Sequence, residues 1–150
     1  MAFIGEEVED QKGATPFAPR CTKDVIEERL FQLNRHMFSG LNMVFFVTTS
    51  IYFEGAGGET LGERGFSKDH RPELNQMVVG AILDENGRPL CCEMWPGDTT
   101  DVKTLTPVVT RIRARFSVSS LCVVADQGMI SKDTMREFDD PANKVPYILL

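Results

Sequence analysis

The sequence predicts an α/β domain built on a mixed β-sheet, and three observations support that fold class. Residues 43–55 give the strongest strand signal, an aromatic and β-branched run that Glu54-Gly55 closes. Residues 74–95 hold two apolar runs joined through Asn86-Gly87, a strong hairpin signal. A second apolar strand, residues 120–126, lies between helical patterns, and parallel strands need such crossover helices.

Composition limits the class of protein. The chain has 150 residues, of which 42% are apolar, so it fits one domain with its own core. Its four cysteines form no CxxC pair and only two histidines accompany them, which indicates neither a zinc site nor a disulfide framework. No apolar run approaches the ~20 residues that span a bilayer, and the N-terminus turns acidic too early for a signal peptide. We therefore expect a reduced, cytoplasmic protein with no membrane partner.

The net charge of −6 argues against a surface that binds nucleic acid everywhere, because phosphate neutralisation needs clustered Lys and Arg. There are two basic clusters. The first holds Lys68 and Arg71, and the second holds Arg111, Arg113 and Arg115. Arg111 and Arg115 are four residues apart and share one helical face, and a solvated face is the favoured interpretation over a nucleic-acid contact.

The N-terminal part divides into an arm and a helix. Residues 1–20 mix charges, glycine and proline without periodicity, which predicts an irregular arm before a domain over residues 21–150. Thr22 is the predicted N-cap of the helix, and Ser39-Gly40 the predicted stop. The pattern indicates one amphipathic helix, with its apolar positions at Ile26, Leu30, Leu33 and Met37.

Two further helices and a strand are predicted in the C-terminal half. Residues 99–116 carry an amphipathic pattern that Pro107 interrupts, so we expect a kink or a restart with Thr106 as cap. Ser131 is the predicted cap of a helix over residues 131–138. Residues 147–150 begin a last strand at the edge of the sheet, which should leave this end loosely packed.

Residues 55–65 contain five glycines in eleven positions, which excludes a regular element. A phosphate-binding loop is one interpretation, but the spacing fits neither GxxxxGK[ST] nor a GxGxxG that follows a strand. A flexible connection is the favoured interpretation.

Asp126 is the candidate functional residue that the pattern itself indicates. It ends the second apolar strand, and ligands of α/β sheets bind at the carboxyl ends of strands where the strand order reverses. The alternative is a capping or turn aspartate, because Asp-x-Gly is common in loops.

Several longer motifs carry a family resemblance. They are VFFVTTSIYFEG, GGETLG, FSKDHRPEL, QMVVG, GRPLCCEMWPG and VVADQGM. In this order they resemble the DDE transposases of bacterial insertion sequences, from about Pro16 to the last residue. The resemblance implies a ribonuclease H-like core, a five-stranded sheet with the hairpin strands on one side, here incomplete at the C-terminus.

The family uses two aspartates and a glutamate to hold two divalent metal ions, Mg²⁺ or Mn²⁺, for DNA strand cleavage and transfer. Magnesium prefers oxygen ligands, and two ions activate the attacking oxygen and stabilise the leaving one. The resemblance places the second aspartate at Asp126 as a catalytic and metal-binding residue. It places the first at Val47, an apolar residue, and the glutamate beyond Leu150. Because the runs 44–53 and 121–125 are both apolar and the second ends on a carboxylate, we expect them to be adjacent parallel strands with Val47 near Asp126. The basic residue often found after the second aspartate is Gln127 here.

No other residue is expected to replace the lost carboxylate. Glu54 is seven residues after Val47, about 23 Å along the strand and on its other face. Thr49 shares the face of Val47 but offers only a neutral hydroxyl, and Glu137 lies on a crossover helix. Lys68 and Arg71 could contact DNA, or they could hold Asp69 and Glu73 in place; both interpretations stay open.

Two functions follow from the resemblance. The first is a fragment or decayed copy of a transposase that no longer cleaves DNA, with weak or no binding of Mg²⁺ or Mn²⁺. The second is a non-catalytic module that binds DNA, such as insertion-sequence ends, or a full-length transposase. A third, a nucleotide-binding protein built on residues 55–65, is the least supported.

Overall fold

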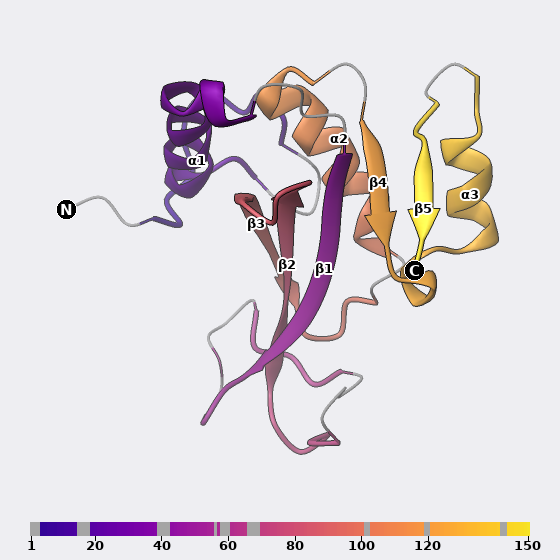
Figure 1. Cartoon of the computed structure of the whole chain (residues 1–150). Coiled ribbons are helices and arrows are strands. Elements are labelled where there is room, and N and C mark those ends of the chain that lie inside the picture. Colours follow the sequence, from indigo (N-terminus) through magenta and orange to yellow (C-terminus); the bar gives the residue numbers. More distant parts are fainter. Residues whose placement is uncertain are drawn as a thin grey trace.

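The computed structural model describes residues 4–14, 19–38, 43–55, 57, 61–65, 70–100, 103–118, 121–141 and 144–150. At its centre is a five-stranded sheet with the strand order β3-β2-β1-β4-β5 (Figure 1). The strands are β1 Met43–Tyr52, β2 Gln76–Asp84, β3 Pro89–Pro96, β4 Cys122–Ala125 and β5 Tyr147–Leu149.

The sheet is mixed. β2 runs antiparallel to both β1 and β3, whereas β4 runs parallel to both β1 and β5. The hairpin strands β2 and β3 therefore lie on one side of β1, and the crossover strands lie on the other. This is a ribonuclease H-like sheet. The predicted fold class is confirmed, as is the prediction that the two buried runs form adjacent parallel strands.

The hairpin turn follows from its residues. The Oδ1 atom of Asp84 accepts hydrogen bonds from the backbone N–H groups of Asn86, at 2.9 Å, and Arg88, at 2.7 Å. Gly87 has a φ of 75°, a left-handed conformation that glycine adopts without steric cost. The turn fixes the register that pairs Ala81 with Cys92.

One core lies between the sheet and two helices, α2 (Leu105–Phe116) and α3 (Lys132–Phe138). Alternate strand residues such as Phe46, Ile82 and Trp95 join Ile112 and Phe138 in a single buried cluster. Both helices connect parallel strands in the same direction across the sheet, and the right-handed crossover rule places them on the same face.

The helix starts agree with the predictions in part. Ser131 caps α3, and its hydroxyl oxygen accepts the N–H of Thr134 at 3.0 Å, as predicted. Pro107 lies in the first turn of α2, as predicted, whereas the predicted kink or restart involves residues 101–102, which lie outside the described residues. Thr106 is not the N-cap, however. The helix begins at Leu105 with Thr104 at the N-cap position, and the Thr106 hydroxyl donates to Glu137 at 3.1 Å.

The first helix, α1 (Thr22–Leu33), forms, but its predicted apolar positions do not enter the core, as the apolar stripe of an ordinary amphipathic helix does. Its N-cap is Cys21 rather than Thr22, and the Cys21 N–H donates to Asp24 at 2.9 Å. Asp24 is fully buried. The predicted apolar positions are exposed: 46% for Ile26, 53% for Leu30, 63% for Leu33 and, in the 3₁₀ turn η1 (Arg35–Phe38), 42% for Met37.

A buried ion-pair cluster explains this orientation. Arg115 of α2 pairs with Asp24 at 3.1 Å, with Glu28 at 3.0 Å and with Glu93 of β3 at 3.2 Å. Arg111 pairs with Asp24 at 3.1 Å and Glu93 at 2.9 Å. The side chains of Arg111 and Arg115 are 3% and 1% exposed, so the predicted solvated arginine face is wrong. Two buried guanidinium groups need carboxylate partners, and α1 supplies them with its inner face.

α1 also covers the free edge of the sheet. β3 is an edge strand, and at Cys92 its outward backbone groups meet two side chains of α1. Lys23 Nζ donates to the Cys92 carbonyl oxygen at 2.6 Å, and the Cys92 N–H donates to Glu27 Oε1 at 3.0 Å. Such contacts protect an edge strand from pairing with another chain.

The rest of the described chain is irregular or short. Residues 4–14 contain no helix or strand beyond an isolated bridge from Glu7 to Cys21, and much of the glycine-rich segment lies outside the described residues. Among the helices that the structure describes, none is long and apolar enough to cross a lipid bilayer.

Candidate functional site

A hollow of about 410 Å³ opens where β4 ends beside β1. β4 stops at Ala125, whereas β1 continues to Tyr52 beside β2, so beyond Phe45 β1 is paired with β2 only (Figure 1). Residues of β1 and β4, of the turn after β4 and the residue after β5 line the hollow: Phe45, Phe46, Val47, Thr48, Val124, Ala125, Asp126, Gly128, Met129 and Leu150.

Val47 and Asp126 line this hollow together. The parallel register pairs Phe45 with Val124, so Val47 and Asp126, each two residues further on, reach the same level and the same face of the sheet. The predicted proximity of these two residues is therefore confirmed. Val47 is 54% exposed, since it pairs with Ala81 of β2 on one side and lies beyond the end of the β1–β4 pairing on the other.

Asp126 also acts as a cap. It precedes the 3₁₀ turn η3 (Gln127–Met129), and its Oδ1 atom accepts the Gly128 N–H at 2.7 Å. Asp126 is therefore a turn cap, as the Asp-x-Gly pattern allowed, and it is also the residue that follows the end of β4. The side chain remains exposed to the hollow, with Oδ2 as its second carboxylate oxygen.

The donor set of the hollow does not fit a pair of divalent cations. Among the described residues that line it, Asp126 supplies the only side-chain carboxylate, one oxygen of which accepts the Gly128 N–H, and most of the other side chains are apolar. Two hard cations need several oxygen ligands each, with carboxylates to balance their charge. Within the described residues, no group of three His, Cys, Asp or Glu side chains is placed to hold a metal ion.

The comparisons with known proteins give a likeness of fold. No family model matches the sequence, and no curated protein matches it. Among solved structures, the chain is similar to a Mos1 transposase paired-end complex with left transposon end, with a TM-score of 0.44 and 10% identity over 100% of this chain. It is also similar to a Mos1 mariner paired end complex with Mn, with a TM-score of 0.42 and 9% identity over 98% of this chain. It spans 45% of the length of each of those chains.

The residues considered as replacements for a lost carboxylate lie elsewhere. Glu54 follows the far end of β1, beyond Tyr52, and Thr49 pairs with Val79 without lining the hollow. Glu137 accepts the Thr106 hydroxyl and lines a separate cavity of about 280 Å³ between α2 and α3. The structure thus brings none of the three to Asp126.

The candidate DNA-binding residues are not beside Asp126. Lys68 lies outside the described residues. Arg71 is exposed, and its guanidinium carbon lies 5.7 Å from the centre of the Tyr52 ring, a cation–π distance. Tyr52 is five residues after Val47, or roughly 17 Å along the strand. Arg71 therefore belongs to the opposite end of β1.

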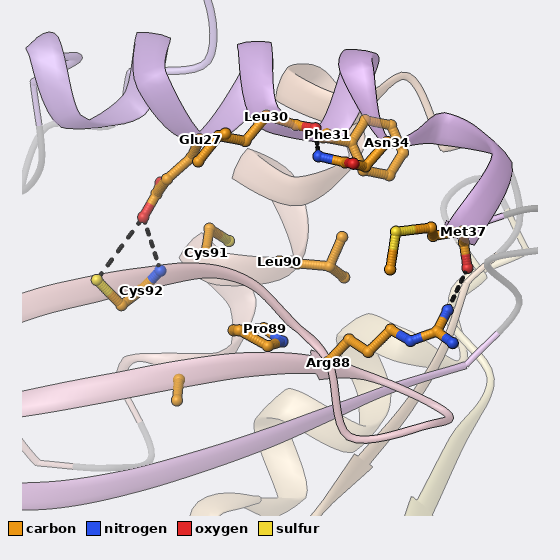
Figure 2. A pocket seen from close by; sticks show the side chains of 11 residues that line it. Glu27, Leu30, Phe31, Asn34, Met37, Arg88, Pro89, Leu90, Cys91 and Cys92 are labelled. Carbon is orange, nitrogen blue, oxygen red and sulfur yellow. Dashed lines mark hydrogen bonds between the residues drawn. The ribbon is translucent and has the colours of Figure 1, made fainter.

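A second hollow, of about 580 Å³, was not predicted from the sequence. It lies between α1 and the β2–β3 hairpin, and Figure 2 shows Leu30 and Phe31 on its helix side and Leu90 and Cys91 on its strand side. Arg88 closes one end by donating to the Met37 carbonyl oxygen at 2.7 Å. Burial raises the pKa of the Cys91 thiol, so this sulfur is protonated and unreactive at neutral pH.

Proposed function

We propose that this chain is a transposase-like domain, related to metal-dependent DNA strand cleavage and transfer, that has lost that activity. One observation carries the proposal: Val47 and Asp126 lie at one level of two adjacent parallel strands and line one hollow. The sequence resemblance to DDE transposases puts the first two catalytic aspartates at these two positions, and here only one of them is a carboxylate.

The chemistry explains why one carboxylate is insufficient. Two divalent ions bring four positive charges, and both must be bridged and positioned for an in-line attack on phosphate. Asp126 provides one negative charge, and its backbone contact to Gly128 restricts how its carboxylate can turn. Val47 contributes a β-branched apolar side chain where the second ligand would lie, so even a single ion lacks its partner.

Titration with Mn²⁺ tests this proposal directly. The unmodified chain should bind Mn²⁺ with a dissociation constant no tighter than ~10⁻³ M, as expected for a site with few charged ligands. Val47→Asp should bind at least ten times more tightly, because it restores a second carboxylate at the level of Asp126. Asp126→Asn in the Val47→Asp background should remove that gain. Binding of two Mn²⁺ ions per unmodified chain in the micromolar range would contradict the proposal.

A second candidate is a non-catalytic module that binds DNA or a full-length transposase. The exposed Arg71 supports a DNA contact, but the burial of Arg111 and Arg115 removes the other basic cluster from the surface. A pull-down separates the two proposals. If the immobilised chain retains an intact related transposase, the binding module is favoured. If it retains none, the first proposal, a transposase-like domain that has lost its activity, is favoured.

A further inference from the structure

One face of the sheet is apolar along its strands, and Asp126, at the end of β4, is the charged residue that the register places on it among the described residues. Successive strand residues point to opposite faces, and residues paired across neighbouring strands point to the same face. The pairs from Met43 with Cys122 to Ile51 with Met77 therefore define which residues belong to this face. Its sixteen residues, hereafter the open face, are Met43, Phe45, Val47, Thr49, Ile51, Met77, Val79, Ala81, Leu83, Cys92, Met94, Pro96, Cys122, Val124, Ile148 and Leu150.

This composition differs from that of a solvated sheet face. A sheet with one side in water normally alternates apolar residues with polar ones, and charged side chains occupy the wet side. Among these sixteen residues Thr49 supplies the only hydroxyl group and none is charged, whereas Asp126, two residues after Val124, lies on the same face at the end of β4. This composition is typical of a sheet face that is buried against another element or another chain.

The described helices leave most of this face uncovered, and α1 reaches it at the β3 side, where Ala81 and Cys92 line the hollow beside that helix. α2 and α3 pack on the opposite side, where the alternate residues form the core. Val47 is 54% exposed, Ile51 44% and Ile148 45%, and Val124 alone among the sixteen is buried. A large apolar surface of this kind marks an interaction site.

We propose that a second copy of this chain packs on the open face, sheet against sheet, about a two-fold axis. Five strands about 4.8 Å apart and roughly 20 Å long give on the order of 480 Å² of flat area per copy. Two such faces bury about 1,000 Å² or more of accessible surface, which reaches the range of stable interfaces. A two-fold contact is self-complementary, and the sixteen open-face residues bring no charge into it that would need a buried partner.

Other surfaces and occupants fit less well. The exposed stripe of α1 has only a few apolar side chains on one short helix, which is less area than a stable interface buries. Nucleic acid is a poor occupant of the open face because its sixteen residues include no Lys or Arg to neutralise phosphates. Aligned sheets about 10 Å apart, crossing at about 30°, would interdigitate their side chains.

Sedimentation equilibrium of the full chain, with a matched pair of variants, tests this inference. Ile51 is 44% exposed on the open face, and Ile26 is 46% exposed on α1, so Ile51→Lys and Ile26→Lys introduce the same charge at equal exposure. The unmodified chain and Ile26→Lys should form dimers of equal affinity. Ile51→Lys should weaken the dimer at least tenfold, because it would bury an ammonium group between two apolar faces.

Thr49→Lys provides a second variant on the same face, at an exposed position that is already polar, in case Ile51→Lys fails to fold by circular dichroism. It should weaken the dimer as well. A chain that stays monomeric at high concentration would overturn the inference. Loss of the dimer in Ile26→Lys, alone or together with Ile51→Lys, would also overturn it, since the contact would then involve α1. This test is independent of the proposed function, which depends on metal binding.

Discussion

Arg115 of α2 and Asp24 of α1 form an ion pair at 3.1 Å in which both side chains are 1% exposed. Arg115 also pairs with Glu28 and Glu93, so one guanidinium group joins α1, α2 and β3. A buried charge costs free energy unless it is paired and hydrogen-bonded. The contact therefore fixes α1 against the domain although the helix exposes most of its apolar side chains.

Arg115→Ala should lower the free energy of unfolding by about 3–5 kcal/mol, because it leaves buried carboxylates without their main partner. The control is Arg136→Ala, which breaks an ion pair with Asp133 of similar length, 3.0 Å, at 79% and 89% exposure. That change should cost less than ~0.5 kcal/mol. Urea denaturation measures both, and equal effects would contradict the role assigned to the cluster.

Acid should destabilise the protein through Asp24. Burial favours the neutral acid, but the Cys21 N–H, Arg115, Lys23 and Arg111 outweigh it and lower the pKa of Asp24 to about 2. A pKa depressed in the folded state contributes stability above the unfolded value, near 4, and that stability is lost as the pH falls to about 2. The contribution is on the order of 2 kcal/mol.

Unfolding free energies measured from pH 5 to pH 2 check this prediction. The unmodified protein should lose stability steeply between pH 4 and pH 2. Asp24→Asn should be less stable at pH 7 and should lose much less over the same interval. An identical slope in both proteins would show that another group controls the acid response.

Gly80 gives a test of core packing. A Cβ atom there would lie 2.6 Å from the Phe46 ring and 2.8 Å from the Trp95 ring, and those two rings stack edge to face at 6.3 Å. Gly80→Ala should therefore cost about 1–3 kcal/mol, the usual range for overpacking. Gly5→Ala is the control, since a Cβ at Gly5 meets no atom within 4 Å. Thermal unfolding distinguishes the two, and an unchanged Gly80→Ala would contradict the described packing.

DNA binding should be weak. The chain has a net charge of −6, and Arg111 and Arg115 are committed to internal carboxylates. A duplex of random sequence should bind with a dissociation constant no tighter than ~10⁻⁶ M at physiological salt, as for non-specific contacts. Fluorescence anisotropy measures this, and nanomolar affinity would require a basic surface that the described residues do not form.

Local signals predicted much of the fold. Asn86-Gly87 located the hairpin, Ser131 located the start of α3, and the apolar run before Asp126 located β4. Each of these signals acts within a few residues, through turn geometry, capping or strand period. The order of strands then followed from the crossover rule and from the family resemblance.

The orientation of α1 could not be predicted in the same way. Its apolar stripe at Ile26 and Leu30 and its acidic positions at Asp24 and Glu28 both have helical spacing, so periodicity gives two candidate inner faces. Arg111 and Arg115, almost ninety residues away, decide between them. The N-cap of α1 was predicted wrongly for a related reason. Thr22 is the better capping residue by propensity, yet the N-cap is Cys21, whose N–H donates to Asp24, and Asp24 is held in place by the arginines.

For the candidate site, the sequence predicted the position of Asp126 and its proximity to Val47, because both follow from strand period and parallel pairing. It left open whether Asp126 serves as a cap or as a functional residue, and the Gly128 contact shows that it does cap the turn. The hollow beside α1 was missed, since it depends on how α1 is oriented.

The most direct test of the central claim is nicking of supercoiled plasmid DNA in Mn²⁺ or Mg²⁺, with an active DDE transposase as the positive control. The unmodified chain and Val47→Asp should both show no metal-dependent nicking, since one or two carboxylates do not position two ions for attack on a phosphodiester. Nicking by the unmodified chain that requires the metal and disappears in Asp126→Ala would contradict the account.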